Sequence, residues 1–182
     1  MQAISHALPG LLEFIPRLFG DPRGVFYETY SARLMQELGL PADVEWVQDN
    51  QSKSQTGVLR GLHFQRPPQA QAKLVRVAQG RALDVVVDLR KYSPTYGQHV
   101  KVELSSEKGN VLFVPVGFAH GFVALEDETL FLYKCSAYYA PPTEGGLRWN
   151  DPTLGIDWSV AAPLVSAKDE VLPLFQGFES PF

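Results

Sequence analysis

The chain has 182 residues, of which 45% are hydrophobic and 20% charged, and its formal net charge is −4. This composition is that of a globular domain large enough to bury a core without disulfides or a structural metal. The acidic balance argues against nucleic-acid binding, and neither a signal peptide nor an apolar run of the ~20 residues in a membrane span is present. A single cysteine excludes an internal disulfide and fits a reducing compartment. We therefore expect a cytoplasmic protein that has no nucleic-acid or membrane partner.

The first predicted element is a short helix. Ser31 is a suitable N-cap, Leu34, Met35 and Leu38 have the spacing of one buried face, and Gly39 is typical of a helix end. Further short helical turns are expected in the tail, from about Pro152 onward.

Short runs rich in Val, Phe and Leu predict that the rest of the chain is mainly strands. These runs are Val44–Asn50, Val58–Phe64, Lys73–Val77, Ala82–Arg90, His99–Leu104, Val111–Val114 and Thr129–Ala137. Many short strands with close Gly and Pro turns favour a sandwich or barrel over a βαβ array. No phosphate-binding glycine motif follows any strand, so we expect one β-rich domain over residues 1–182.

The spacing of several Gly, His and Pro residues resembles the two motifs of the cupin family, G-x5-H-x-H…E-x6-G and G-x5-P-x-G-x2-H-x3-N. The matching residues are Gly57, His63 and Gly80 in the first motif, and Gly109, Pro115, Gly117 and His120 in the second. The resemblance implies a mainly β, jelly-roll barrel (a double-stranded β-helix) with a few short helices. In cupins of this pattern, three His and one Glu bind a divalent metal.

Three of the cupin motif positions are changed in this chain: Gln65 replaces the second His, Lys73 the Glu and Ala124 the Asn. Two imidazoles and an amide are a poor ligand set for a first-row metal, and an ammonium offers no lone pair and repels a cation. We therefore expect a pocket with no metal and no cofactor. A cluster of Arg60, His63 and Lys73 suits an anionic substrate or a developing oxyanion.

Other polar residues are as readily explained by structure. His6 and His99 are expected to be exposed or structural, and Asp84 and Asp88 alternate with apolar residues as exposed strand positions do.

A longer resemblance covers residues 19–169 in ten ordered segments. They are F-G-D-P-R-G-V-F-Y-E-T-Y (19–30), V-Q-D-N-Q-S-K-S (47–54), V-L-R-G-L-H-F-Q (58–65), A-K-L-V-R-V (72–77), V-P-V-G-F-A-H-G-F (114–122), F-L-Y-K-C (131–135), Y-Y-A-P (138–141), W-N-D-P (149–152), G-I-D-W (155–158) and S-A-K-D (166–169). Together they closely resemble the dTDP-4-dehydrorhamnose 3,5-epimerase family, cupin-fold isomerases of dTDP-rhamnose biosynthesis. The resemblance implies inversion of C3 and C5 of dTDP-4-dehydro-6-deoxy-D-glucose.

The resemblance also implies a role for each catalytic residue. His63 is the general base, Asp169 orients it, Lys73 stabilises the oxyanion at C4, and Tyr133 is the general acid on the other face of the sugar. A phenol with an ordinary pKa of ~10 keeps its proton at neutral pH, as a donor must.

The same resemblance implies a set of substrate contacts and a homodimer. The contacts are Arg23, Glu28, Gln48, Asp49, Asn50, Arg60, His120, Tyr139, Glu144 and Lys168. Arg suits the diphosphate because its planar fork donates paired hydrogen bonds, and Tyr139 matches the residue that stacks on thymine. The N-terminal segment is expected to be exchanged between subunits, so that Arg23 and Glu28 serve the partner's site.

Three alternatives stay open at this point. A 3- or 5-monoepimerase of a related dTDP-4-keto-deoxysugar would share the fold and the base. A metal-dependent cupin would require bound Fe, Mn or Zn, against Gln65 and Lys73. A non-catalytic sugar-nucleotide-binding cupin would have no use for His63, Tyr133 and Asp169 together.

Overall fold

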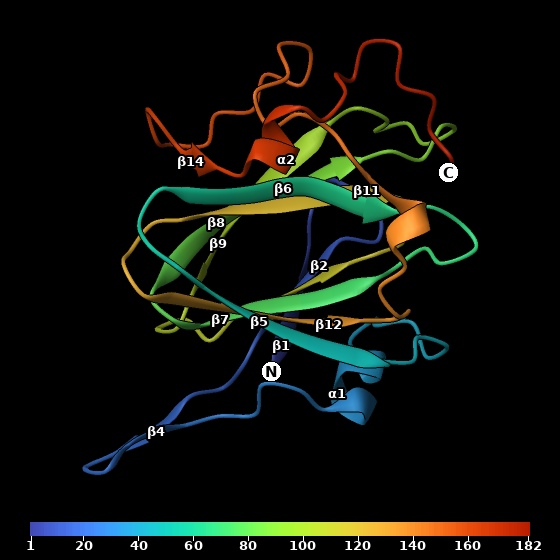
Figure 1. The fold of residues 1–182 in the computed structure, drawn as a ribbon. Coiled ribbons are helices and arrows are strands. Elements are labelled where there is room, and N and C mark those ends of the chain that lie inside the picture. The colour runs from blue at the N-terminus through green and yellow to red at the C-terminus, as the bar shows by residue number, and fades with distance from the viewer.

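Two β-sheets face each other in the computed structural model, which describes residues 1–182 (Figure 1). The first sheet has the order β1-β2-β10-β7-β12-β5, and the second has the order β13-β6-β11-β8-β9 with β14 beside β6. The first comprises β1 (Gln2–Ser5), β2 (Leu12–Ile15), β10 (Val111–Val114), β7 (Lys73–Gln79), β12 (Thr129–Cys135) and β5 (Gln48–Ser54). The second comprises β13 (Glu144–Gly146), β6 (Val58–Gln65), β11 (Phe118–Ala124), β8 (Arg81–Asp88), β9 (His99–Ser105) and β14 (Leu164–Val165). The prediction of a mainly β, cupin-type barrel is confirmed.

The main core lies between the two sheets. Phe122 of β11 and Phe131 of β12 stack across it with ring centroids 3.9 Å apart. Burying a side chain of this size contributes about 1.5–3 kcal/mol. Two further clusters cover the outer faces, one beneath the C-terminal segment and one beneath the N-terminal helix. Strands such as β11 are therefore buried at every position.

The predicted helix is confirmed as α1 (Ala32–Glu37). It begins after Ser31, whose side chain makes no capping hydrogen bond, and Met35 is its one buried residue. The chain leaves the helix through Gly39, where φ is +107°, a conformation that glycine adopts without strain. The other helices are η1 (Pro141–Thr143) and α2 (Ala167–Glu170). None of the helices is long and apolar enough to cross a membrane.

Two expectations about individual segments are corrected. The strand expected over Val44–Asn50 begins only at Gln48, because Val44 and Trp46 pack against the outer cluster beneath α1 instead of pairing in the sheet. Asp84 and Asp88 are fully buried rather than exposed, because both faces of β8 are covered.

One hairpin extends away from the barrel. It consists of β3 (Phe19–Asp21) and β4 (Gly24–Phe26), and Figure 1 shows it projecting at the lower left, clear of both sheets. Its apolar side chains are exposed, with Phe26 at 70% and Val25 at 58%.

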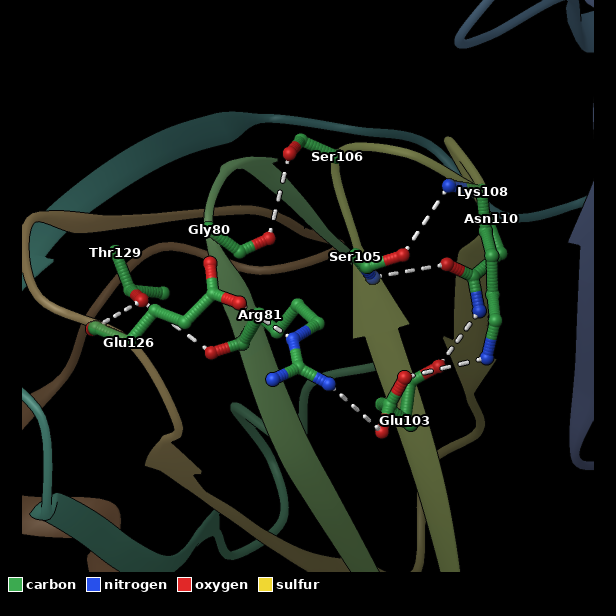
Figure 2. A network of polar contacts seen from close by, with 9 residues as sticks. All are labelled: Gly80, Arg81, Glu103, Ser105, Ser106, Lys108, Asn110, Glu126 and Thr129. Carbon is green, nitrogen blue, oxygen red and sulfur yellow. Dashed lines mark hydrogen bonds and ion pairs between the residues drawn. The ribbon is translucent and has the colours of Figure 1, made fainter.

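A polar network ties together the turns at one end of the barrel (Figure 2). Arg81 donates to Glu126 at 2.6 Å, and the Asn110 amide donates to the Glu103 carbonyl at 2.9 Å. Gly80 lies here with φ +78°, and a Cβ at this position would be 2.7 Å from the Thr129 hydroxyl. The network holds the C-terminal end of β7. Lys73, which lines the candidate site, lies at the N-terminal end of the same strand.

Candidate active site

Two cavities open between the sheets and share three lining residues. The larger has a volume of about 540 Å³ and the smaller about 370 Å³, and His63, Lys73 and Tyr133 line both. His63 comes from β6 of one sheet, whereas Lys73 and Tyr133 come from β7 and β12 of the other. The fold therefore brings these three predicted catalytic residues together from opposite walls of the barrel.

His63 and Asp169 form a carboxylate–imidazole pair. The distance from His63 Nε2 to Asp169 Oδ1 is 2.6 Å, and only 5% of the Asp169 side chain is exposed. The Ser166 hydroxyl caps α2 by accepting from the Asp169 amide, and the Gly61 amide donates to Asp169 Oδ2. With Nε2 held by the carboxylate, Nδ1 is the ring nitrogen left to accept a proton.

The environment keeps Asp169 ionised. Burial by itself raises the pKa of this carboxyl, but the hydrogen bond and charge of His63, with the Gly61 and Ser166 hydrogen bonds, outweigh burial and hold the pKa below its usual value. The fourth predicted catalytic residue is thus placed and charged to orient His63.

Lys73 and Tyr133 present their polar atoms without a hydrogen-bond partner in the protein. Burial lowers the pKa of Lys73, while the Coulomb effects of Cys135, Asp84 and Glu144 act in the opposite direction. Burial raises the pKa of the Tyr133 phenol, which therefore keeps its proton at neutral pH. Both groups are free to hydrogen-bond a bound molecule.

Gln65 occupies the position of a metal ligand in other cupins but has a structural role here. Its Nε2 donates to the carbonyls of Gln69 at 2.6 Å and Tyr138 at 3.2 Å, and its Oε1 accepts from the Ala140 amide at 2.8 Å. The side chain is buried and braces two loops at the cavity. Nowhere does the fold gather three or more His, Cys, Asp or Glu side chains that could hold a metal ion. An amide already used by the backbone, beside the Lys73 ammonium, does not fit a metal.

Most of the predicted substrate contacts line these cavities. Gln48, Asn50, Tyr139 and Glu144 line the smaller one, and Arg60, His120 and Lys168 the larger.

A chain of hydrogen bonds connects the predicted contacts along the rim. Lys168 lies 2.6 Å from Glu144, which accepts from the Tyr139 hydroxyl at 3.0 Å. Gln48 accepts from the Tyr139 amide and donates to Asn50. These side chains are thus already ordered around the opening.

Three predicted contacts lie elsewhere in this chain. Arg23, in the turn of the projecting hairpin, and Glu28, two residues after it, are exposed and line neither cavity; Arg23 pairs with Asp21 at 2.6 Å. Asp49 lies on the opposite face of β5 and pairs with Lys134 at 2.8 Å, so it does not reach the site from within its own subunit.

Sequence reasoning missed Asp84, which lies behind His120. The His120 Nε2 is 2.8 Å from Asp84 Oδ2, and burial raises the pKa of this carboxyl although His120 and Lys73 counteract it. The available signal was the valine run Val85–Val87, which indicates a strand covered on both faces and so places Asp84 inside the barrel.

Comparison with known proteins agrees with this geometry. The family model described as dTDP-4-dehydrorhamnose 3,5-epimerase matches residues 5–177. The dTDP-4-dehydrorhamnose 3,5-epimerase of Salmonella typhimurium is 51% identical over 175 residues, which cover 96% of this chain and 95% of that protein.

Solved structures give the same result. The Bacillus anthracis dTDP-4-dehydrorhamnose 3,5-epimerase, with TDP and PPi bound, has a TM-score of 0.92 and 44% identity over 96% of this chain and 99% of the other. The Legionella pneumophila dTDP-6-deoxy-D-glucose-3,5-epimerase, in complex with dTDP-4-keto-L-rhamnose, has a TM-score of 0.91 and 43% identity over 98% and 94%. The chain belongs to the dTDP-4-dehydrorhamnose 3,5-epimerase family.

Proposed function

We propose that this isomerase of dTDP-rhamnose biosynthesis inverts C3 and C5 of dTDP-4-dehydro-6-deoxy-D-glucose with His63 as base, Lys73 as oxyanion partner and Tyr133 as acid. The observation that carries the proposal is the meeting of these three side chains at the junction of two cavities, with base and acid on opposite sheets. Inversion needs a base on one face of the sugar ring and an acid on the other.

The C4 ketone makes the chemistry accessible. His63 Nδ1 removes the proton from C3 or C5, the electron pair of the C–H bond moves into the enolate, and the charge develops on the C4 oxygen. The Lys73 ammonium stabilises that oxygen, an effect worth about 10²–10³ in rate at comparable sites. Tyr133 then donates its proton to the same carbon from the opposite face. The phenolate regains a proton from solvent, and His63 releases the proton it removed to solvent, so that both groups return to their starting states. Repetition at the second carbon completes the double inversion.

Charge around the larger cavity supports a diphosphate ligand. Arg60, Lys73 and Lys168 line it, against one carboxylate, Asp169. Charge-assisted hydrogen bonds from such cations are roughly twice as strong as neutral ones. We assign the diphosphate to Arg60 and Lys168, with His120 as a further substrate contact.

The smaller cavity supplies groups for the rest of the nucleotide sugar. Gln48, Asn50 and Glu144 offer hydrogen bonds, and Tyr139, at 54% exposed, presents an open ring for stacking on thymine. The similar Legionella epimerase, whose structure is in complex with dTDP-4-keto-L-rhamnose, supports this ligand class.

We further propose that residues 1–182 form one epimerase domain whose N-terminal hairpin is exchanged in a homodimer. The exposed Val25 and Phe26 of the hairpin support a partner surface, and exchange would bring Arg23 and Glu28 to the partner's site. The single, buried thiol of Cys135 is compatible with a cytoplasmic location, which we also propose.

Subunit mixing tests the exchange. Arg23→Ala and His63→Asn homodimers are each expected to have little activity. In a mixed dimer, the Arg23→Ala subunit keeps its own His63 and receives Arg23 from its partner, so one site is restored. Activity that does not rise after unfolding and refolding the two variants together would contradict exchange.

The reaction itself is tested by NMR in deuterated water with dTDP-4-dehydro-6-deoxy-D-glucose. The wild type is expected to place deuterium at both C3 and C5 of an L-configured product. His63→Asn should lower exchange by 10²–10⁴-fold, the usual contribution of a general base, and should still bind dTDP. Deuterium at one carbon only would indicate a monoepimerase, and near-normal turnover in His63→Asn would show that the base is another residue.

A further inference from the structure

A second carboxylate–imidazole pair lies beside the first. His120 pairs with His63 across β11 and β6, and Asp84 lies on β8, the next strand of the same sheet. The His120–Asp84 distance of 2.8 Å resembles the 2.6 Å of the His63–Asp169 pair. Asp84 is fully buried and His120 is 7% exposed, so the second pair lies deeper in the barrel.

Only one of the two carboxylate oxygens of Asp84 has a hydrogen-bond partner. Its Oδ2 accepts from His120, but its Oδ1 is buried without any hydrogen-bond partner. Asp88, on the same strand and equally buried, instead accepts hydrogen bonds from Arg90, Ser93 and Thr95. A buried, poorly bonded carboxylate is costly to the fold. Stability alone therefore does not account for Asp84.

The ammonium of Lys73 is complementary in charge to the Asp84 carboxylate. The ammonium makes no ion pair or hydrogen bond, although the site needs it charged. The titratable and charged groups that face Lys73 or line the same cavities are Cys135 and Tyr133 of β12, Asp84 of β8, Glu144 of β13, Arg60 and His63 of β6, His120 of β11, and Lys168 and Asp169 of α2. Of the three carboxylates among them, Glu144 is already paired with Lys168 and Asp169 with His63.

We propose that Asp84 is a positioning residue for the epimerase reaction: it holds the proton on His120 Nε2 and supplies the buried negative charge that keeps Lys73 protonated. His120 then has Nδ1 as its one nitrogen free for substrate. This inference rests on the proposed function, because Lys73 matters here as the partner of the C4 oxyanion.

The test compares Asp84→Asn with Asp88→Asn, which removes an equally buried carboxylate of β8 that is bonded to Arg90, Ser93 and Thr95 instead of His120. Asp84→Asn keeps the side-chain shape and removes the charge. We expect its kcat to fall about 100-fold with little change in KM. The alkaline limb of its pH–rate profile should move down by about one pH unit, because an ammonium that loses a nearby negative charge has a lower pKa. In Asp88→Asn, the alkaline limb of the pH–rate profile should stay at the same pH as in the wild type.

Nitrogen-15 NMR of histidine-labelled protein gives a readout that does not depend on activity. In the wild type, neutral His120 should carry its proton on Nε2, and in Asp84→Asn this preference should be lost. If Asp84→Asn fails to fold, the wild-type spectrum still decides, because a neutral His120 with its proton on Nδ1 would overturn the proposal.

Two kinetic outcomes would also overturn it: an unchanged alkaline limb in active Asp84→Asn, or an equal shift in Asp88→Asn. Inactivity of the wild type toward the nucleotide sugar would instead refute the proposed function, and the His120 spectrum would still test the role of Asp84.

Discussion

Replacing Tyr133 by Phe separates proton removal from inversion. The substitution removes one oxygen that has no hydrogen-bond partner in the protein, and it leaves the ring packed near Phe131, with ring centroids 6.5 Å apart. The free energy of unfolding should therefore change by no more than about 0.5 kcal/mol. His63 can still remove the proton and Lys73 can still hold the enolate. The donor that remains is the histidine that took the proton, on the original face.

Loss of a general acid typically costs 10²–10⁴-fold in rate, or about 3–5 kcal/mol in the activation free energy of inversion. Deuterium exchange, which needs only the base and the oxyanion partner, should fall far less. The assay follows both rates by NMR in deuterated water, from label in recovered substrate and from formation of the L-configured product. In the wild type the two rates should be similar, and in Tyr133→Phe exchange should exceed inversion at least 100-fold. Inversion at the wild-type rate would refute the two-face mechanism and move the acid role to another group or to water.

Three further outcomes are expected. Calorimetry should show that Lys73→Met binds dTDP as tightly as the wild type does, whereas its deuterium exchange should be 10²–10³-fold slower. An exchange rate within tenfold of the wild-type rate would contradict the oxyanion role of Lys73. Exhaustive chelation should leave activity unchanged, because Gln65 is hydrogen-bonded to backbone groups and Lys73 is a cation. Activity that is lost on chelation and regained only with added metal would contradict a metal-free mechanism. Burial raises the pKa of Asp88, but the hydrogen bonds from Arg90, Ser93 and Thr95 lower it more, from 3.8 to about 2. The ionised carboxylate therefore stabilises the fold by about 2 kcal/mol. This stabilisation is fully present above the pKa of the unfolded state and is lost as the pH falls through about 2. In urea unfolding, the gap between wild type and Asp88→Asn should therefore narrow from pH 5 to pH 2, and a constant gap would contradict the cause given.

The sequence predicts those strands that show alternation or clear boundaries. In the run His99–Leu104, Lys101 is exposed while Val102 and Leu104 are buried, as the alternation predicts. The strand β11 was not predicted because all seven of its residues are buried, and no alternation marks a strand that packs on both faces.

The candidate site follows the same logic. The cupin spacing locates His63, Lys73 and His120, since turn glycines such as Gly57 (φ +80°) fix where each strand begins. Spacing says nothing about which strands face each other, so the placement of Tyr133 opposite His63 and of Asp84 behind His120 had to come from the fold. The hairpin with Arg23 lies outside both cavities, and spacing along the chain does not predict where such a projecting segment lies.

Because Gln65 braces two loops, a cupin metal site cannot be built in this barrel by a single substitution. Restoring the cupin metal set needs His at position 65 and Glu at position 73 together, and each single step is harmful. A His at 65 would leave the Ala140 amide and the Gln69 and Tyr138 carbonyls without the partner that Gln65 now provides, at a cost of about 0.5–1.5 kcal/mol for each hydrogen bond lost. The loosened segment carries Tyr139, which we propose stacks on thymine, so the change would disturb the proposed nucleotide contact before a metal could bind. A metal site at these two positions would therefore require both substitutions together with a new support for the loops that Gln65 now holds.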